Sequence, residues 1–374
     1  MKKVGMDVGK KQSDCCVFDE SGKIVERFQV RTRRAALSKV FANRENSEIG
    51  IESCRDSGWL YEHLTSLGHG VMVLDTTRSR SIGIGEGRRK SDRRDAEAIG
   101  RALVSGVAKP AHVLSTQRRR LRDALWGRDK LVATRTRFIA MLRGQFQGRG
   151  QDTPKCSAEN FAARLRQSGL PEVEDPAVQS MLRILDQVNA ELAVLDRHVT
   201  GLAKQEESFE RLCSVPGVGP ITALAFIAAV DNAERFPDAH AVEGYLGFGT
   251  SEYSTGGKRR TGRITKCGNP MARRMLVMAA QNTLKGSSNN DDPLVVWAKQ
   301  VESRRQKKRA VVGLARRLAG VLWAMTVDGT FYDPHGLARA SWQGMSRRAR
   351  RAEAEARSMK AVCEAAAVAQ TSVG

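Results

Sequence analysis

The chain has 374 residues, more than a single hydrophobic core usually organises, so two or three structural units are expected. It carries 62 Lys and Arg against 41 Asp and Glu, a formal charge of +21 that repels itself unless a polyanion neutralises it. Nucleic acid fits this charge best, and an anionic membrane surface is the competing partner.

Neither membrane insertion nor a thiolate metal site is expected. No apolar run approaches the roughly 20 residues that a spanning helix needs, and the opening MKKVGMDVGKK lacks the apolar core of a signal peptide. We therefore expect a soluble, cytosolic protein. The seven cysteines are scattered without a C-x-x-C pair, and the six histidines lack ligand spacing, which argues against a disulfide framework and against zinc. Any metal should be a hard cation held by carboxylates.

The first 110 residues alternate strand and helix patterns and form the first predicted domain. Residues 3–9 and 15–30 predict three short strands, with a turn signal at 19–22. The segments expected next are a helix at 32–43, a strand at 48–53, a helix at 57–68, a strand at 70–75, and a helix from near Ser91 after a basic loop. This succession predicts a layered α/β domain with an RNase H-like strand order.

The second predicted domain, residues 111–208, contains two long helical segments at 114–147 and 176–211. In the latter, apolar residues recur at three- and four-residue steps, which is typical of a coiled coil or a long helical hairpin. They are Leu182, Leu185, Val188, Leu192, Leu195, Val199 and Leu202. Such a seam packs a helix in its own bundle or mediates subunit contacts, and the basic face of the first helix also suits a nucleic-acid arm.

The third predicted domain, residues 209–333, begins with VPGVGP between two helical stretches. This pattern resembles a helix-hairpin-helix, in which Gly217 and Gly219 would let backbone N–H groups approach a DNA phosphate. A plain tight turn between buried helices is the alternative. Helical patterns follow at 271–284 and 294–326. The tail at 334–374 is rich in Ala, Arg and Glu and predicts a loosely ordered segment.

Four carboxylates stand at positions that suit a metal site. Asp7 lies inside an apolar strand and Glu52 ends another, where an ionised group needs a positive partner. Asp92 and Asp95 lie three residues apart at a helix start and so share one face. Together they would offer the oxygen ligands that Mg²⁺ prefers. The alternative is that the aspartates favour the helix N-terminus and that Asp7 and Glu52 pair with arginines.

Residues 252–269, EYSTGGKRRTGRITKCGN, place hydroxyls before a glycine pair and a basic run. From these residues alone, Ser254 is either part of a phosphate-binding turn or a nucleophile, with Ser251 and Thr255 as the competing hydroxyls. The glycines allow close backbone approach to a phosphate, and the cations would neutralise its charge. The expected nucleic-acid contacts here are Gly256, Gly257, Lys258, Arg259, Arg260, Arg263 and Lys266.

The motifs GMDVGK, IES and KSDRRDAEAI, followed by VPGVGPIT and YSTGGKRRTGRITKCGN, resemble those of the insertion-sequence transposases with a RuvC-like DEDD domain and a C-terminal serine domain. The resemblance covers roughly residues 1–330. Thr255 stands where a second serine is common and Cys267 where Arg is usual. The spacing after Glu52 is irregular against the usual pattern. The fold implied is a RuvC-like α/β domain, a long helical coiled-coil region, and a mostly α-helical C-terminal domain containing a helix-hairpin-helix.

The resemblance also implies an activity and its partners. Ser254 would form a covalent phosphoserine link with DNA, and the four acids would hold Mg²⁺. A bridge RNA would pair with donor and target DNA, which suits a chain with much positive charge and few base-reading motifs. Two DNA partners imply at least a dimer, and the family suggests a tetramer. The expected location is the bacterial cytosol, on the nucleoid when active.

Two other functions compete with this one. The first is a RuvC-like structure-specific endonuclease that hydrolyses DNA at the four acids and uses Ser254 only to bind phosphate. The second is a non-catalytic nucleic-acid-binding protein.

Overall fold

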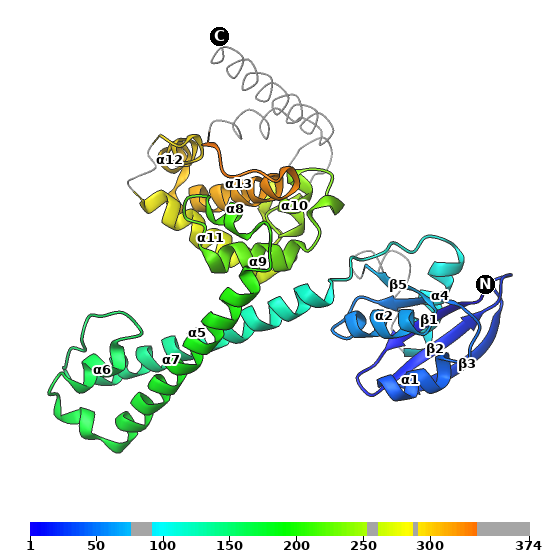
Figure 1. Ribbon diagram of the computed structural model, residues 1–374, viewed down its shortest axis with the longest axis horizontal. Coiled ribbons are helices and arrows are strands. Elements are labelled where there is room, and N and C mark those ends of the chain that lie inside the picture. The colour runs from blue at the N-terminus through cyan, green and yellow to red at the C-terminus, as the bar shows by residue number, and fades with distance from the viewer. Residues whose placement is uncertain (76–91, 253–260, 287–290, 335–374) are drawn as a thin grey trace, which may run out of the picture. The chain divides into compact units, whose positions relative to one another are not determined.

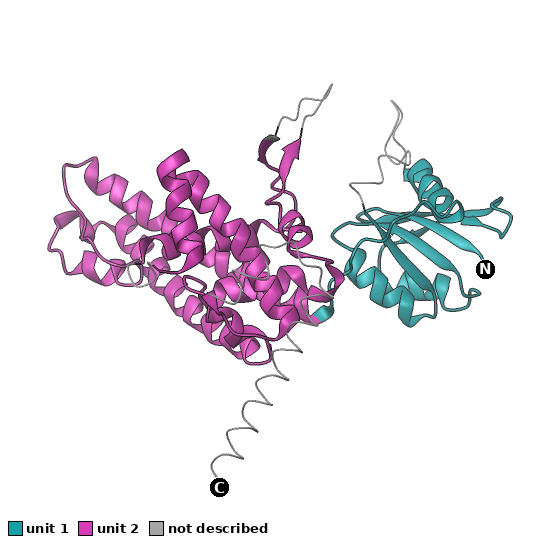
Figure 2. Cartoon of the chain, turned by 90° about the horizontal axis from the view of Figure 1, so that it is seen from above, with its two compact units in different colours: residues 1–116 teal, residues 117–374 magenta. Residues whose placement is uncertain are grey.

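The structure is a computed structural model that describes residues 1–75, 92–252, 261–286 and 291–334. The chain divides into two compact units, Met1–Thr116 and Gln117–Gly374 (Figure 2). The helical residues 117–208 therefore belong to the same unit as the C-terminal helices.

The first unit is built on a five-stranded mixed sheet with the order β3-β2-β1-β4-β5 (Figure 1). The first three strands form an antiparallel meander, and the last two run parallel to β1. Their bounds are β1 (Lys3–Val8), β2 (Gln12–Phe18), β3 (Ile24–Arg31), β4 (Glu48–Glu52) and β5 (Gly70–Leu74). The predicted mixed α/β order is confirmed, and this sheet is consistent with an RNase H-like domain.

Helices cover both faces of this sheet. One face buries Met6 and Ile51 against α1 (Arg34–Phe41) and α2 (Ser57–Ser66). The other face receives α4 (Asp92–Val104), whose Ile99 and Ala102 are buried. Because successive side chains of a strand point to opposite faces, Gly5 and Gly50, the neighbours of Met6 and Ile51, lie under α4.

Glycines at this interface bring α4 very close to the sheet. A Cβ atom on Gly5 would lie 2.1 Å from the Ala96 carbonyl oxygen and 2.3 Å from the Gly100 nitrogen. A Cβ atom on Gly100 would in turn lie 2.1 Å from the ring of Phe18 on β2. The backbone of the helix therefore rests directly on β1, and no larger residue fits without moving α4.

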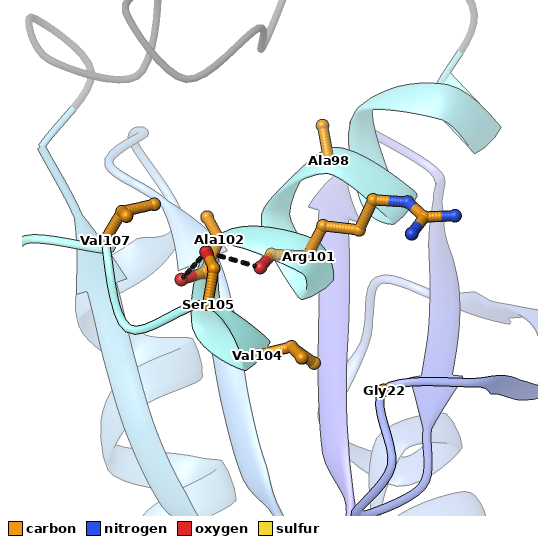
Figure 3. Close-up of a pocket in the computed structure, with 7 residues that line it drawn as sticks. All are labelled: Gly22, Ala98, Arg101, Ala102, Val104, Ser105 and Val107. Atoms are coloured by element: carbon orange, nitrogen blue, oxygen red, sulfur yellow. Dashed lines mark hydrogen bonds between the residues drawn. The ribbon is translucent and has the colours of Figure 1, made fainter.

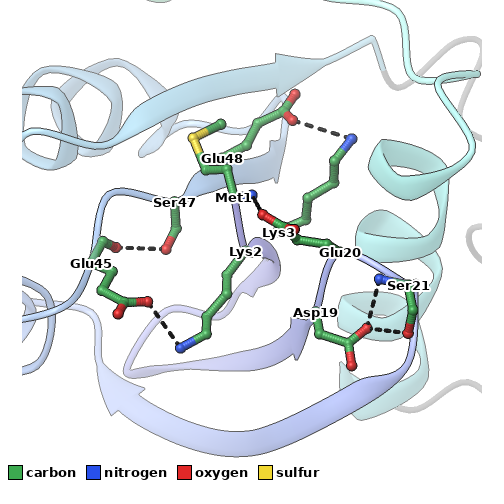
Figure 4. A network of polar contacts seen from close by, with 9 residues as sticks. All are labelled: Met1, Lys2, Lys3, Asp19, Glu20, Ser21, Glu45, Ser47 and Glu48. Carbon is green, nitrogen blue, oxygen red and sulfur yellow. Dashed lines mark hydrogen bonds and ion pairs between the residues drawn. The ribbon is translucent and has the colours of Figure 1, made fainter.

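Polar contacts join the start of β1 to neighbouring elements at the C-terminal end of α4 (Figure 4). The Lys3 ammonium donates to the Leu103 carbonyl oxygen at 2.7 Å and lies 3.3 Å from Glu48. A cation at the last carbonyls of α4 interacts favourably with the helix dipole. Lys2 lies 3.1 Å from Glu45. The start of β1 and the end of α4 are thus tied together, which sets the height of the helix along the strand.

The second unit begins with two long antiparallel helices, α5 (Thr116–Gln147) and α7 (Pro176–Ala203). Arg128 on α5 pairs with Asp196 on α7 at 2.5 Å. At the far end, α6 (Phe161–Arg166) and η2 (Pro171–Glu174) close a small core of their own. Five of the seven predicted seam residues are buried within the chain, and Leu195 and Leu202 are half-buried.

Six shorter helices and a two-stranded hairpin complete the described part of this unit (Figure 1). Its core surrounds Trp323, whose indole N–H donates to the Ala233 carbonyl oxygen at 2.9 Å. The elements are α8 (Phe209–Cys213), α9 (Pro220–Val230), α10 (Ala239–Tyr245), α11 (Pro270–Lys285), α12 (Pro293–Arg305), α13 (Lys307–Asp328), β6 (Thr250–Glu252) and β7 (Thr261–Ile264), with one 3₁₀ turn, η3 (Ala233–Arg235).

Three sequence-based expectations need correction. The helix predicted over 176–211 ends at Ala203, and Arg118 of α5 binds Glu206 in the following turn. The helix predicted over 294–326 breaks at Gln306, where φ is +140°. Its second half, α13, is long and apolar enough to cross a membrane, contrary to expectation. Most of α13 is nevertheless buried among α10, α11 and α12, as in the core helix of a soluble domain.

We expect Gly5→Ala to lower the free energy of unfolding of the first unit by about 3 kcal/mol, because the new methyl group overlaps the backbone of α4. Calorimetry and hydrogen exchange of α4 amides would measure this loss. Gly144→Ala is the matched control, since it lies on α5 with nothing near its Cβ position, and it should be neutral or stabilising by up to about 1 kcal/mol. Equal melting of the two variants would contradict the close packing.

Candidate active site

Asp7 and Glu52 lie side by side on the face of the sheet that α4 covers. Met6 of β1 pairs with Ile51 of β4 in parallel register, so the next residue of each strand is a carboxylate. Gly5 and Gly50 stand two residues before Asp7 and Glu52 and lie under α4. Because residues two apart on a strand share a face, both carboxylates are on the face that α4 covers. Both side chains are half-buried.

The first turn of α4 brings two more carboxylates to the same end of the sheet. Ala96 and Gly100 rest on Gly5, so Asp95, one residue before Ala96, and Asp92, one turn before it, stand closer to the strand ends where Asp7 lies. Asp95 is buried and Asp92 is exposed. The chain thus collects four acids that are up to 88 positions apart in sequence.

Burial and neighbouring negative charge both act on Asp7. Burial, and then the negative charges of Asp92, Asp95 and Glu52, raise the pKa of Asp7 from 3.8 to about 6. Asp14 contributes to the same effect. It stands directly opposite Asp7 in the β1–β2 register and was not among the predicted site residues, although its alternation with Cys16 along β2 places it on the same face.

Another acid on α4 shows what a structural carboxylate looks like here. Glu97 receives a hydrogen bond from Arg27 at 2.6 Å and two from Arg101, and these contacts lower its pKa. Among the described residues, none of the four predicted acids forms an ion pair with Lys or Arg. Within the described ranges, neither Asp7 nor Glu52 is balanced by a neighbouring arginine.

A hard divalent cation suits this donor set. The available ligands are carboxylate oxygens, and a cation would relieve the repulsion that raises the pKa of Asp7. In the described part of the chain, no three His, Cys, Asp or Glu side chains stand close enough to hold an ion in their present rotamers.

A shallow pocket on the first unit lies away from the acids, along the C-terminal half of α4 (Figure 3). Small apolar residues line most of it. Its hydroxyl, on Ser105, donates to the Arg101 carbonyl oxygen at 2.9 Å and so caps the helix. The pocket contains no carboxylate or histidine, and nothing in it suits the chemistry of the acidic end. Its lining residues are Gly22, Ala98, Arg101, Ala102, Val104, Ser105 and Val107.

Four exposed cations border the acidic end of the sheet and form what we term the basic rim: Lys10, Lys11, Arg31 and Arg33. None of them pairs with a carboxylate among the described residues. Thr32 holds the rim in shape, because its hydroxyl donates to the Gly9 carbonyl oxygen at 2.7 Å and its amide to that of Lys11 at 3.0 Å. Sequence reasoning missed this feature, although two of its lysines follow GMDVG directly.

The predicted nucleophile Ser254 lies outside the described residues, together with Thr255, Gly256, Gly257, Lys258, Arg259 and Arg260. The flanking strands β6 and β7 pair antiparallel, so this segment connects the two strands of a hairpin. Ser251, a competing hydroxyl, donates to the Arg263 carbonyl oxygen at 3.1 Å. The side chains of Arg263 and Lys266 are exposed at the base of the hairpin, as contacts to a polyanion would require.

A short connection joins α8 to α9 where the sequence resembles a helix-hairpin-helix, and packing explains one of its glycines. Gly217 has φ +82°, and a Cβ atom there would lie 2.2 Å from the Thr283 hydroxyl of α11. That hydroxyl donates to the Pro216 carbonyl oxygen at 2.7 Å. Gly219, at the N-cap of α9, has open space around it. Their contact with nucleic acid remains a prediction.

Two family models match this chain. Residues 4–149 match a model described as a transposase of the DEDD type found in IS110, and residues 209–292 match the IS116/IS110/IS902 transposase family. The chain belongs to this transposase family. The first match spans the sheet, α4 and all four acids. The second spans α8 to α11, including the segment that carries Ser254.

Curated relatives agree along nearly the whole chain. The transposase for insertion sequence element IS1111A of Coxiella burnetii is 27% identical over 87% of this chain and 89% of its own length. A "Probable family 20 transposase" of Pseudomonas aeruginosa is 26% identical over 89% and 99%. The transposase for IS1328 of Yersinia enterocolitica is 24% identical over 88% and 98%. The protein is accordingly a DNA transposase, an enzyme that acts on DNA.

The raised pKa of Asp7 predicts a stability change with pH. An acid whose pKa rises on folding stabilises the fold below its unfolded value, near 3.8, and this contribution is lost as the pH rises through about 6. Asp7→Asn removes the charge, so this variant should melt a few degrees above the parent at pH 8, with little difference at pH 4. Thermal melts across this range would measure the effect.

Asp19→Asn is the control of opposite sign. The Ser21 hydroxyl and the backbone amides of Lys23 and Ser21 lower the pKa of Asp19, so removing its charge should bring no gain at pH 8. A parent protein that melts above Asp7→Asn at pH 8 in the absence of divalent cations would contradict the coupling of the acids.

Proposed function

We propose that this transposase excises and inserts its element by a covalent phosphoserine intermediate at Ser254, with Mg²⁺ held by Asp7, Glu52, Asp92 and Asp95. The observation that supports this most is the gathering of four acids at one end of the sheet, where no described Lys or Arg pairs with them, whereas Glu97 on the same helix pairs with two arginines. Such an arrangement is unfavourable for stability and is typical of a site that meets a cation.

The chemistry follows from the residue types. The Ser254 oxygen would attack a DNA phosphorus, and the bond from that phosphorus to one bridging oxygen would break. The serine proton would pass to the carboxylate cluster, and the departing strand would take up a proton from water and leave with a free hydroxyl. A hydroxyl of another DNA end would then attack the phosphoserine and restore the enzyme. When bound, Mg²⁺ would stabilise charge on the phosphate and the leaving oxygen.

The cations have a complementary role. The basic rim stands at the acidic end of the sheet, so a phosphodiester backbone bound there would pass beside Asp7. Arg263 and Lys266 would position backbone at the serine hairpin. Gly219 and the exposed face of Gly217 would approach a further phosphate. These contacts read no base sequence, which suits guidance by a bridge RNA that pairs with donor and target DNA. Joining two DNAs implies a dimer or a tetramer.

We expect a suicide DNA substrate to trap a protein–DNA adduct that survives denaturation, because the leaving strand escapes before it can reverse the attack. Ser254→Ala should form no adduct. Ser251→Ala, whose hydroxyl is engaged within the hairpin, should retain it, and Asp7→Ala, Glu52→Ala and Asp95→Ala should lose adduct and cleavage together. Denaturing gels would measure both products.

The rivals give different results in the same assay. Normal cleavage by Ser254→Ala without an adduct would identify a hydrolytic nuclease of the resolvase type. Unchanged activity after all three acid substitutions would identify a non-catalytic nucleic-acid-binding protein. Loss of the adduct in Ser251→Ala but not in Ser254→Ala would move the nucleophile to residue 251.

We expect Lys10→Gln/Lys11→Gln to weaken DNA binding and to lower the salt dependence of the binding constant by about two units of log–log slope, since each lost phosphate contact removes about 0.9. Fluorescence anisotropy at several salt concentrations would measure this. The control is Lys2→Gln/Lys23→Gln, which removes the same charge at the opposite end of the sheet. Equal slopes for the two double variants would show that the rim does not contact DNA.

A further inference from the structure

Trp126 on α5 is one of the most exposed large apolar side chains in the described part of the chain, at 62% of its full surface. Its neighbours Leu121 and Leu125 are buried, so α5 packs through another face and presents the indole to solvent. A tryptophan in this position loses hydrophobic free energy unless something covers it.

Cations flank the exposed indole on both sides. Lys130, one turn later, places its ammonium 5.3 Å from the ring centroid. Arg122, one turn earlier, is exposed and lies on the same face of α5. Arg137 and Met141 continue this exposed face along the helix. We term Arg122, Trp126 and Lys130 the α5 platform.

The charges around the platform favour an anionic partner. Asp129, one turn beyond on an adjacent face, is engaged by Arg274 of α11. Asp123 is the exposed acid at the other flank. A second copy of this helix would place Arg122, Lys130 and Arg137 against the same cations, and like charges oppose that contact. An aromatic ring with cations at its two ends matches instead a base with a phosphate on either side.

The platform is also connected to the serine hairpin. Arg274 ties the start of α11 to α5 beside Trp126. The neighbouring Arg273 donates to the carbonyl oxygens of Leu246 and Cys267, both at 3.0 Å, in the loops that hold β6 and β7. A strand bound on α5 would therefore lie on a helix that is linked, through α11, to the loops beside β6 and β7.

We propose that Trp126 stacks on an unpaired base of a nucleic-acid strand, with Arg122 and Lys130 on the flanking phosphates. The proposal rests on the proposed function, which requires strands with unpaired bases, but it concerns binding and not the covalent step. Stacking on an aromatic ring selects single strands over duplex, because bases in a duplex are already stacked on each other.

The test uses the full chain without divalent cations and three probes: a single-stranded DNA oligonucleotide, an RNA of the same sequence, and the DNA duplex. Trp126→Ala should weaken single-strand binding about 10-fold or more, whereas Trp126→Phe should keep most of it. Duplex binding should change less than twofold. A single strand should quench part of the tryptophan fluorescence of the parent, and this quenching should be lost in Trp126→Phe. The DNA and RNA arms identify which strand the platform holds.

Matched controls keep the outcome decisive. Ile184→Ala removes another exposed apolar side chain, from α7, and Lys155→Gln removes an exposed cation from the loop after α5; neither should alter single-strand affinity. Arg122→Gln and Lys130→Gln should each lower it. Equal single-strand affinity of Trp126→Ala and the parent would overturn the proposal. It would also be overturned if Trp126→Ala changed the oligomeric state and left the affinity unchanged. Adduct formation at Ser254, measured separately, distinguishes this failure from failure of the proposed function.

Discussion

The close approach of α4 to β1 is the constraint on which the acidic site depends. Gly5 lets the backbone of α4 rest on β1, and Gly50 and Gly100 leave room for the side chains of Leu103 and Phe18, so the first turn of α4 stands level with the ends of β1 and β4. Had any of the three been larger, Asp92 and Asp95 would stand further from Asp7 and Glu52. Residues without functional groups thus determine where the functional groups meet.

Charge is distributed unequally over the first unit. At the start of β1, Lys2 and Lys3 are neutralised by Glu45 and Glu48, whereas the rim cations at the other end have no carboxylate partners in the described ranges. The acids follow the same division, since Glu97 is paired and Asp7 has no cationic partner among the described residues. Groups that stabilise the fold are balanced within it, and under the proposed function those at the acidic end would meet an external ion or strand.

Much of the first unit could be predicted from local patterns. The predicted strand at 48–53 and helix at 57–68 match β4 and α2 within two residues, because alternation and turn residues are local signals. The four acids were proposed because Asp7 interrupts an apolar strand, Glu52 ends another, and Asp92 and Asp95 begin a helix. Asp14 and the basic rim were missed, since their relevance depends on the pairing of β2 with β1 and β3.

The second unit was harder to predict for a related reason. The apolar period of α7 gave its seam, but the break at Gln306 and the burial of α13 depend on tertiary packing that no local pattern encodes. The sequence left Gly217 open between phosphate approach and a plain tight turn, and its close contact with Thr283 gives it a structural role. The two roles involve opposite sides of one backbone and are compatible.

The loop around Cys267 illustrates how such a structure tolerates drift. Position 267 departs from the arginine usual in the family, yet the contacts it makes with Gly247 and Arg273 come from its main chain, and its side chain is exposed. Replacement there leaves the architecture of the hairpin base unaltered. We therefore expect selection to retain Gly247 and Gly268, where no side chain fits. Position 267 should vary more freely, because its exposed side chain is not needed for the fold.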